Sequence, residues 1–428
     1  MIKKPFFGLG KPKLKYSVIE KQGLDSIKEI PLPDNVTLFL RDADIKKDDL
    51  VSKVGDKVKT GQKLMLIKES KAYLISTVTG TITAISDYTD YLDKIYPTIS
   101  IDVAQENQQD DEFNKTGKTP TAENALEFLN CLPGNPDFTS LLNIDRPLNT
   151  IIINGMDKDL LITTNQIVVK TESENLKKGV EILKKITGIS RIIIIVPPNL
   201  TFHAVGIDAE VKEAGSFYPD TSPQIVLKKI LGIIVPQGEK CEDMGVGFIN
   251  AEAVAALAKA YDHGKLPLNK LLTVIKKDSS TVNVRARIGT PVKDILSALN
   301  IEINHGDRLV FGGPMTGHAV YSGETPALSD TDAIMVQDKG RIVLNSDTQC
   351  INCGECIRAC PVNIPVNMLI RLLENGLYEE AVDDYDLLSC IECGLCSYVC
   401  TARIPVFHYI MFGKHEFTRI KGAEESNA

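Results

Sequence analysis

Eight of the ten cysteines in this chain lie in two runs that repeat each other at an interval of 40 residues. The first run reads Cys350-Ile-Asn-Cys353-Gly-Glu-Cys356-Ile-Arg-Ala-Cys360, and the second reads Cys390-Ile-Glu-Cys393-Gly-Leu-Cys396-Ser-Tyr-Val-Cys400. Three thiolates at two-residue intervals, followed by a fourth, are the spacing that binds a cubane iron–sulfur cluster. Two copies therefore predict two [4Fe–4S] clusters and a role in electron transfer.

The predicted ligand sets exchange one cysteine between the runs. In two-cluster proteins the fourth cysteine of each run commonly binds the other cluster. We therefore predict the following ligands: Cys350, Cys353, Cys356 and Cys400 for the first cluster, and Cys390, Cys393, Cys396 and Cys360 for the second. Gly354 and Gly394 fit the loops, because a residue without a Cβ lets the backbone approach the sulfur atoms. Pro361 follows the first run, whereas Thr401 takes that place in the second.

Other chemistries fit the cysteines less well. Structural zinc uses paired C-x2-C knuckles, and each run here has more cysteines than a tetrahedral site accepts. Disulfides are not expected, because the sequence shows no secretory signal. Cys131 and Cys241 are isolated, and we predict that both are buried free thiols.

The sequence around the cysteine runs is helical. Val366, Leu369, Ile370 and Leu373 recur with helical period, and Gly376 can end that helix. Residues 377–388 carry a second apolar face. We therefore predict an all-helical two-cluster ferredoxin-type module over residues 347–428.

The first part of the chain has a β pattern. Residues 1–104 contain alternating apolar residues separated by glycine turns, as in Val54–Gln62, and resemble the small sandwich of biotinyl and lipoyl carrier domains. Residues 105–120 are polar and rich in Gln, Asp and Asn, which indicates a linker.

Strands and helices alternate over residues 121–265, which predicts an α/β domain with a largely parallel sheet. The expected strands lie within Ile151–Asn154, Ile189–Pro198 (centred on Arg191–Val196) and Ile230–Pro236, and the expected helices are Asn175–Ile186, Ser222–Leu231 and Asn250–His263.

A smaller β-grasp unit is expected over residues 266–322, with a connecting strand within 323–346. Its strands are Leu272–Ile275, Val282–Ile288 and Asp307–Phe311, with a helix from Thr290, a plausible N-cap, to Leu299 and the connecting strand at Asp332–Val336. Gly312–Gly317 is either a tight connection or a weak nucleotide loop. The fold class is thus α/β and multidomain, with a β sandwich, an α/β sheet domain, a β-grasp unit and a helical cluster module.

Composition excludes several other classes. The net charge is −8 and no basic cluster stands out, so we expect no nucleic-acid partner. No run approaches the roughly 18 apolar residues that cross a bilayer. We expect a cytoplasmic protein that is soluble or peripheral on the inner face of the cell membrane.

The order of these units resembles the RnfC subunit of the Rnf electron-transport complexes. The resemblance rests on the cysteine runs and on four further segments: Val54–Gln62, Pro236–Lys240, Arg287–Pro291 and Gly312–Gly317. The NADH-binding subunit of respiratory complex I and the related peripheral subunit of the sodium-pumping quinone reductase are similar in their middle domains. The resemblance implies membrane subunits as partners, with ferredoxin or a partner flavoprotein exchanging electrons while Na⁺ or H⁺ is moved.

The same resemblance implies an FMN and NADH site, but the residues depart from it. The family binds these cofactors with a loop similar to GxGGAGFPT and an ECEP-like acidic motif. This chain has Leu132-Pro133-Gly134-Asn135-Pro136 and Met156-Asp157-Lys158-Asp159 at those places. Phosphate groups need backbone N–H groups that approach closely, which glycines permit. We therefore expect FMN binding to fail or be weak, do not expect this chain to oxidise NADH directly, and expect Asp157 and Asp159 to form a solvated turn.

The leading hypothesis is a peripheral electron-transfer subunit of an Rnf-like ion-translocating oxidoreductase that does not itself oxidise NADH. An alternative is an NADH-dependent flavin and iron–sulfur reductase, similar to cobalamin reductases, with a flavin site built from other residues. In a third hypothesis, the middle domains serve only as a docking scaffold.

Overall fold

The computed structural model describes residues 12–19, 27–40, 50–65, 73–90, 94–117, 119–346 and 348–427. It divides into two compact units, each made from separate stretches of chain. The larger unit comprises Ser17–Gly215 and Cys241–Arg341, and the smaller comprises the N-terminal residues to Tyr16, Ser216–Lys240 and Ile342–Ala428. The sequence assigned residues 216–240 to the α/β domain, whereas the structure packs them with the cysteine module.

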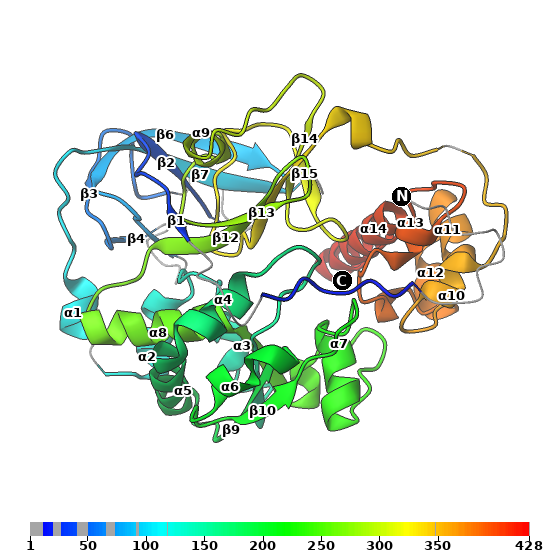
Figure 1. The fold of residues 1–428 in the computed structure, drawn as a ribbon, viewed down its shortest axis with the longest axis horizontal. Helices are drawn as coiled ribbons and strands as arrows, with labels where there is room; N and C mark the ends of the chain where they lie inside the picture. Colours follow the sequence, from blue (N-terminus) through cyan, green and yellow to red (C-terminus); the bar gives the residue numbers. More distant parts are fainter. Residues whose placement is uncertain are drawn as a thin grey trace. The chain divides into compact units, whose positions relative to one another are not determined.

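The larger unit begins with the predicted β sandwich, drawn in blue in Figure 1. Its four-stranded antiparallel sheet has the order β2-β7-β6-β3, and a second pair is formed by β4 and β5. The strands are β2 (Asn35–Phe39), β3 (Lys57–Val58), β4 (Lys63–Met65), β5 (Tyr73–Ile75), β6 (Gly80–Thr89) and β7 (Ile95–Val103). Alternate residues such as Val36, Ile82 and Ile101 face inward and form its core.

The predicted linker contains structure. Within residues 105–120 lies the short helix α1 (Glu112–Thr116). Its Phe113 is buried and packs edge-on against Phe128, with the ring centroids 5.7 Å apart. Helices α2 (Ala122–Asn124) and α3 (Phe138–Leu141) follow. The polar composition of this stretch indicated a linker, but its one buried aromatic residue, Phe113, packs it against the domain.

The α/β domain has the predicted parallel sheet, in the order β10-β9-β8-β11. Its strands are β8 (Thr150–Asn154), β9 (Arg191–Val196), β10 (Glu210–Glu213) and β11 (Val246–Asn250). Its helices are α4 (Thr164–Thr171), α5 (Ser173–Thr187), α6 (Thr201–Ala204) and α8 (Ala251–His263). Gly179 of α5 lies against the backbone of Val254 in α8, where a Cβ would collide. The predicted helices Asn175–Ile186 and Asn250–His263 are confirmed as α5 and α8, with Asn250 as the N-cap of α8.

The unit for which a β-grasp was predicted contains a six-stranded mixed sheet in the order β1-β13-β12-β16-β14-β15. Its elements are β1 (Lys28–Glu29), β12 (Asn269–Ile275), β13 (Thr281–Arg287), α9 (Val292–Ala298), β14 (Arg308–Phe311), β15 (His318–Val320) and β16 (Ala333–Gln337). The N-cap prediction was wrong, because Pro291 precedes α9 and the Thr290 hydroxyl instead donates to the carbonyl of Arg287.

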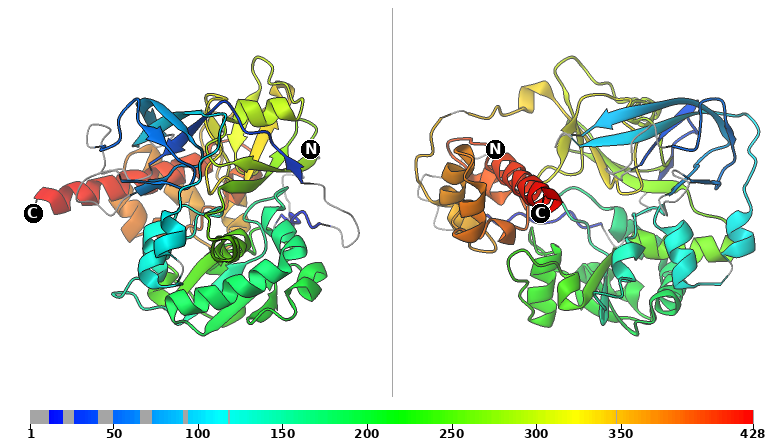
Figure 2. Two further views of the ribbon diagram at one scale, coloured as in Figure 1. Left: turned by 90° about the vertical axis from the view of Figure 1, so that its left-hand side faces the viewer. Right: turned by 180° about the vertical axis from the view of Figure 1, so that it is seen from behind.

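The smaller unit is helical in its described part and ends with the orange and red helices of Figure 2. Its helices are α7 (Pro223–Val226), which continues as a π-helical turn over Leu227–Leu231, then α10 (Glu355–Ala359), α11 (Val366–Glu374), α12 (Tyr378–Asp383), α13 (Leu395–Val399) and α14 (Val406–Asn427). A buried strand at Ile230–Pro236 was predicted wrongly. Ile234 is exposed there and the chain is not extended in a sheet.

Candidate iron–sulfur site

The two cysteine runs fold into two copies of one backbone shape. Positive φ angles occur at matching positions 40 residues apart, in the pairs Asn352 and Glu392, Gly354 and Gly394, and Asn363 and Arg403. In each copy a short helix, α10 or α13, begins directly after the glycine. The sequence repeat is therefore a repeat of local conformation, and each copy turns its cysteines toward the inside of the module.

The eight cysteines line two cavities, four cysteines in each. Cys350, Cys353, Cys356 and Cys400 line one cavity. Cys360, Cys390, Cys393 and Cys396 line the other. This grouping is the one predicted from the exchange of the fourth cysteine between runs. Ligation of iron by these thiols stays a prediction, and the structure brings together the four side chains that each cluster needs.

The two cavities are neighbours because single helices contribute to both. Cys356 lies in the first turn of α10 and Cys360 directly follows that helix, yet they line different cavities. Four residues of helix span only about 6 Å. Cys396 and Cys400 make the same link through α13. Helices α10 and α13 also contact each other directly. A cluster in each cavity would therefore lie beside the other.

The walls of both cavities are largely apolar. Ile370, Ile404 and Val406 line the first, and Ile364, Val366 and Ile410 line the second. Burial raises the pKa of the Cys356 thiol to about 11 and that of Cys393 to about 12. A bound metal stabilises the thiolate form and displaces these protons. The thiols therefore fit a cationic iron cluster, which compensates charge that the apolar walls disfavour.

No described group of three or more His, Cys, Asp or Glu side chains is arranged to hold one metal ion. Each cavity is lined instead by four thiols, the number that a cubane cluster requires, since each thiolate binds a different iron atom. Cys131 and Cys241 lie outside both cavities as free thiols, Cys241 buried and Cys131 partly buried.

The two cavities differ in cover. Cys350, Cys353 and Cys400 of the first are partly exposed, whereas Cys360, Cys393 and Cys396 of the second are buried. Near the first cavity, Arg358 donates to the carbonyl of Cys353 at 2.9 Å and pairs with Glu355. The Thr401 hydroxyl, in the position where the first run has proline, lies 3.8 Å from the Cys353 sulfur. Solvent exposure and nearby hydrogen-bond donors both influence the reduction potential of a cluster. Clusters in the two cavities are therefore expected to differ in reduction potential.

Comparison with known families decides the assignment of the chain. Three family models match: the RnfC barrel sandwich hybrid domain over residues 18–106, the Nuo51 FMN-binding domain over 137–259, and the 4Fe-4S dicluster domain over 342–401. The chain is RnfC-like.

Several curated relatives are C subunits of ion-translocating oxidoreductase complexes. The C subunit of the proton-translocating ferredoxin:NAD(+) oxidoreductase complex of Clostridium ljungdahlii is 27% identical over 422 residues, which cover 93% of this chain and 91% of that protein. The C subunit of the ion-translocating oxidoreductase complex of Buchnera aphidicola is 26% identical over 379 residues, 84% of this chain and 79% of that protein. The Na(+)-translocating counterpart from Acetobacterium woodii is 25% identical over 235 residues, 52% of this chain and 53% of that protein.

Within the described residues of this RnfC-like chain, no helix is long and apolar enough to cross a membrane.

The acidic turn after β8 is buried in this RnfC-like chain, so the expectation of a solvated turn was wrong. Asp157 is 1% exposed and Asp159 is 2% exposed. Asp157 accepts hydrogen bonds from the Thr164 hydroxyl at 2.8 Å and the Asn165 amide at 2.9 Å. Burial raises the pKa of both carboxyl groups, and the hydrogen bonds they accept act in the opposite direction. These residues therefore stabilise the interior of the domain.

The carboxylate of Asp159 is bound by the glycine loop Gly312–Gly317. It accepts from the Thr316 amide at 2.7 Å and the Thr316 hydroxyl at 2.8 Å, and from the Met315 amide at 3.1 Å. A Cβ on Gly313 would lie 2.5 Å from the Asp159 carboxyl carbon, so glycine is required there. Of the two interpretations left open, the loop is a tight connection whose N–H groups already bind a carboxylate.

The segment that stands in place of the flavin loop, Leu132–Pro136, also forms hydrogen bonds with other parts of the chain. The Gly134 amide donates to the carbonyl of Ser329 at 2.8 Å, and its carbonyl accepts from the Asn250 side chain at 2.8 Å. Leu132 and Phe138 are buried. The N–H and carbonyl groups of Gly134 are therefore both paired within the chain.

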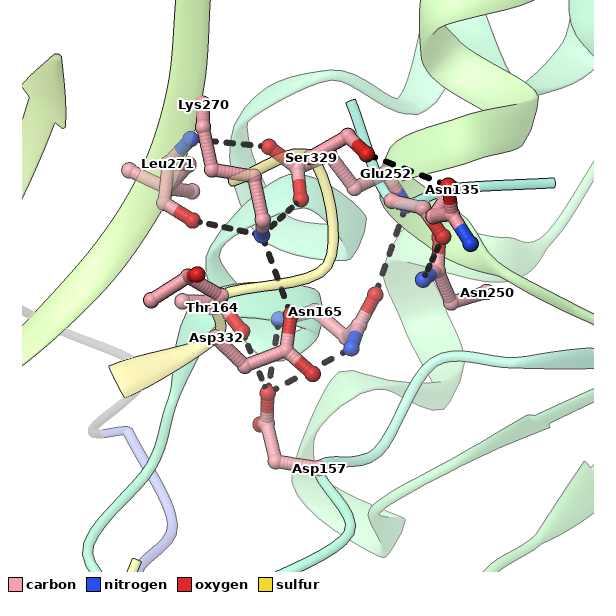
Figure 3. A network of polar contacts seen from close by, with 12 residues as sticks. Asn135, Asp157, Thr164, Asn165, Asn250, Glu252, Lys270, Leu271, Ser329 and Asp332 are labelled. Atoms are coloured by element: carbon pink, nitrogen blue, oxygen red, sulfur yellow. Dashed lines mark hydrogen bonds and ion pairs between the residues drawn. The ribbon is translucent and has the colours of Figure 1, made fainter. Parts of the chain in front are cut away.

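A buried ionic network joins the α/β domain to the six-stranded sheet (Figure 3). Lys270 of β12 is 0% exposed and donates to Glu252 at 2.5 Å and to Asp332 at 3.0 Å. The Leu271 amide donates to the other Glu252 oxygen at 2.8 Å. Although burial by itself lowers the pKa of Lys270, the two carboxylates raise it well above its usual value. The ion pairs therefore link helix α8 of the α/β domain to the six-stranded sheet.

Proposed function

We propose that this chain is a peripheral electron-transfer subunit of an ion-translocating membrane complex, similar to the Rnf complexes of its relatives. Single electrons pass through its two [4Fe–4S] clusters, with Cys350, Cys353, Cys356 and Cys400 on one and Cys390, Cys393, Cys396 and Cys360 on the other. The observation that carries the proposal is the pair of neighbouring four-cysteine cavities linked through α10 and α13.

The cysteine thiolates would bind the iron atoms of each cluster, and the rest of the protein positions these thiolates. Apolar side chains exclude water from the cavities, and backbone turns fix the sulfur positions. Each cluster supplies a site that accepts and releases one electron. Adjacent sites suit a relay whose donor and acceptor are partner proteins: ferredoxin or a flavoprotein on one side and a membrane subunit on the other.

We further propose that the relay operates without FMN or NADH on this chain. Support comes from the engaged backbone of Gly134 and from the burial of Asp157 and Asp159 among donors of the chain. A second candidate function, an NADH-dependent flavin and iron–sulfur reductase, is favoured by the match of the Nuo51 FMN-binding domain to residues 137–259.

An anaerobic titration distinguishes the two functions. The purified chain is mixed with NADH, and separately with a chemically reduced ferredoxin, and the EPR signals of the chain's reduced clusters are recorded, because the oxidised ferredoxin regains the visible absorbance that the chain's clusters lose. The proposal predicts reduction of the clusters by the ferredoxin, no reduction by NADH and no flavin released on denaturation. Rapid reduction by NADH together with stoichiometric FMN would establish the reductase instead.

A further inference from the structure

The segment Ser216–Lys240 places a side chain against the backbone of Cys393, a residue of the second cysteine cavity. The hydroxyl of Tyr218 donates a 2.6 Å hydrogen bond to the backbone carbonyl of Cys393, which lies 175 residues later in the chain. Tyr218 is 4% exposed. Cys393 lines the second cavity and belongs to the predicted ligands of the second cluster. A buried hydroxyl from a distant segment therefore ends beside a candidate ligand.

Tyr218 is held in place by the N-terminal stretch of the same unit. Its amide donates to the carbonyl of Leu14 at 2.8 Å, and Lys15 forms an antiparallel bridge with Phe217. Its ring packs edge-on against Tyr16, with centroids 5.8 Å apart, and the Tyr16 hydroxyl lies 2.7 Å from that of Thr221. The position of the Tyr218 hydroxyl is thus fixed by backbone pairing and by packing.

The same segment contacts the module at a second place. The side-chain amide of Gln237 donates to the carbonyl of Val382 at 2.5 Å. A Cβ on Gly238 would be in ordinary contact, 3.8 Å, with Leu388, two residues before Cys390. Residues 216–240 therefore touch the second cysteine run near Cys393 and the helical sequence that precedes it.

In each repeat the carbonyl of the second cysteine accepts a side-chain hydrogen bond, but the donor differs between the repeats. In the first, the carbonyl of Cys353 accepts from Arg358 of the same run. The equivalent residue of the second run is Tyr398, which is 46% exposed. The equivalent carbonyl, that of Cys393, accepts from Tyr218 instead. The second run thus lacks an arginine of its own at this place and takes its donor from another part of the chain.

We propose that Tyr218 is a positioning residue for the second cluster, which rests on the proposed function in that a cluster occupies this cavity. Its hydroxyl fixes the loop that carries Cys393 and places the positive end of a dipole beside the cluster. Hydrogen bonds and groups around the ligands tune cluster potential and stability. Because reduction adds negative charge, such a donor stabilises the reduced cluster and raises its potential.

The test uses Tyr218→Phe in the full chain, purified anaerobically beside the wild type. The substitution keeps the buried ring and removes only the hydroxyl, so the fold is retained. Tyr321→Phe is the matched control, because that ring is 78% exposed and belongs to the other unit. Arg358→Met, which removes the donor to Cys353, identifies the signal of the first cluster. Both cluster potentials are measured by redox titration with EPR detection, and iron loss in air is timed.

Tyr218→Phe should keep both clusters, lower the potential of the second cluster alone, and hasten loss of iron from that cluster. Potentials and iron loss equal to those of Tyr321→Phe would overturn the inference, and so would equal shifts of both clusters, which indicate a merely structural role. A wild-type chain without clusters would overturn the proposed function as well. Two normal clusters with an unaffected Tyr218→Phe variant would overturn this inference only.

Discussion

The ammonium group of Lys414 donates a 2.7 Å hydrogen bond to the backbone carbonyl of Cys390, and a second of 2.8 Å to the carboxylate of Glu392. Lys414 belongs to α14, and Cys390 lines the second cavity. Burial raises the pKa of the Cys390 thiol, while the nearby Lys414 charge lowers it. A positive charge is therefore directed at the ligand loop of the second site.

Replacing Lys414 by methionine should lower the potential of the second cluster, because the reduced form loses a nearby positive charge. The shift should be on the order of tens of millivolts, as expected for one partly screened charge. Lys421→Met is the control: it lies on the same helix but pairs with Glu379 and Glu424. Redox titration of both variants checks this, and equal potentials in the Lys414 and Lys421 variants would refute it.

Because the fourth cysteine of each run lines the cavity of the other run, its replacement should abolish the cluster of that other run. Cys360→Ala should abolish the second cluster although Cys360 lies in the first run, because its side chain lines the second cavity. Cys400→Ala should abolish the first cluster for the same reason. Each variant should retain about four irons. EPR spectra of the two variants, compared with those of Cys353→Ala and Cys393→Ala, show which signal remains. Loss of the same signal in Cys360→Ala and Cys353→Ala would contradict the exchanged grouping.

The buried lysine network should dominate the stability of the larger unit. Lys270→Met leaves Glu252 and Asp332 without their cation, and breaking a buried pair in this way costs about 3–5 kcal/mol. Lys293→Met removes an exposed ion pair with Glu324 and should cost no more than about 1 kcal/mol. Urea unfolding followed by circular dichroism measures both. A Lys270→Met change as small as that of Lys293→Met would show that the network is dispensable.

The six-stranded sheet should lose stability in acid through Asp307. Lys277, together with backbone N–H groups of Asn304 and Lys339, holds the pKa of Asp307 at about 2, below the usual value of 3.8. Its folded-state pKa is thus lower than its unfolded value. The resulting stability is present above pH 3.8 and is lost as the pH falls through about 2.

The melting temperatures of wild type and Asp307→Asn should therefore differ by a constant amount between about pH 5 and 7, and converge as the pH falls from about 4 to 2. Both proteins lose any acid-labile cluster equally, so the difference reports on Asp307. A difference that persists unchanged at about pH 2 would be inconsistent with the lowered pKa.

Local sequence patterns predicted the elements that carry the cysteines. The helix at Val366–Glu374 follows from its apolar spacing, and β9 at Arg191–Val196 from its run of isoleucines. The 40-residue repeat explains the paired backbone turns, because the same residue spacing imposes the same local geometry in both runs. The division of the eight cysteines between two cavities agrees with the predicted exchange of the fourth cysteine, whereas their ligation of iron stays a prediction.

Contacts between distant segments could not be predicted in this way. Nothing around Tyr218 marks it as a partner of Cys393, because the hydrogen bond depends on how residues 216–240 pack. Asp157 and Asp159 were expected at the surface because carboxylates are usually solvated. Their donors, such as Thr316, come from far along the chain. Arg358, by contrast, lies inside the first cysteine run, and its proximity to the cluster loop was visible in the sequence.

Iron and sulfide content, combined with EPR of the fully reduced chain, tests the two-cluster relay most directly. After anaerobic purification we predict about eight irons and about eight sulfides per chain, with an EPR spectrum broadened by magnetic interaction between two adjacent reduced clusters. About four irons with a single isolated signal, or no iron at all, would contradict the relay.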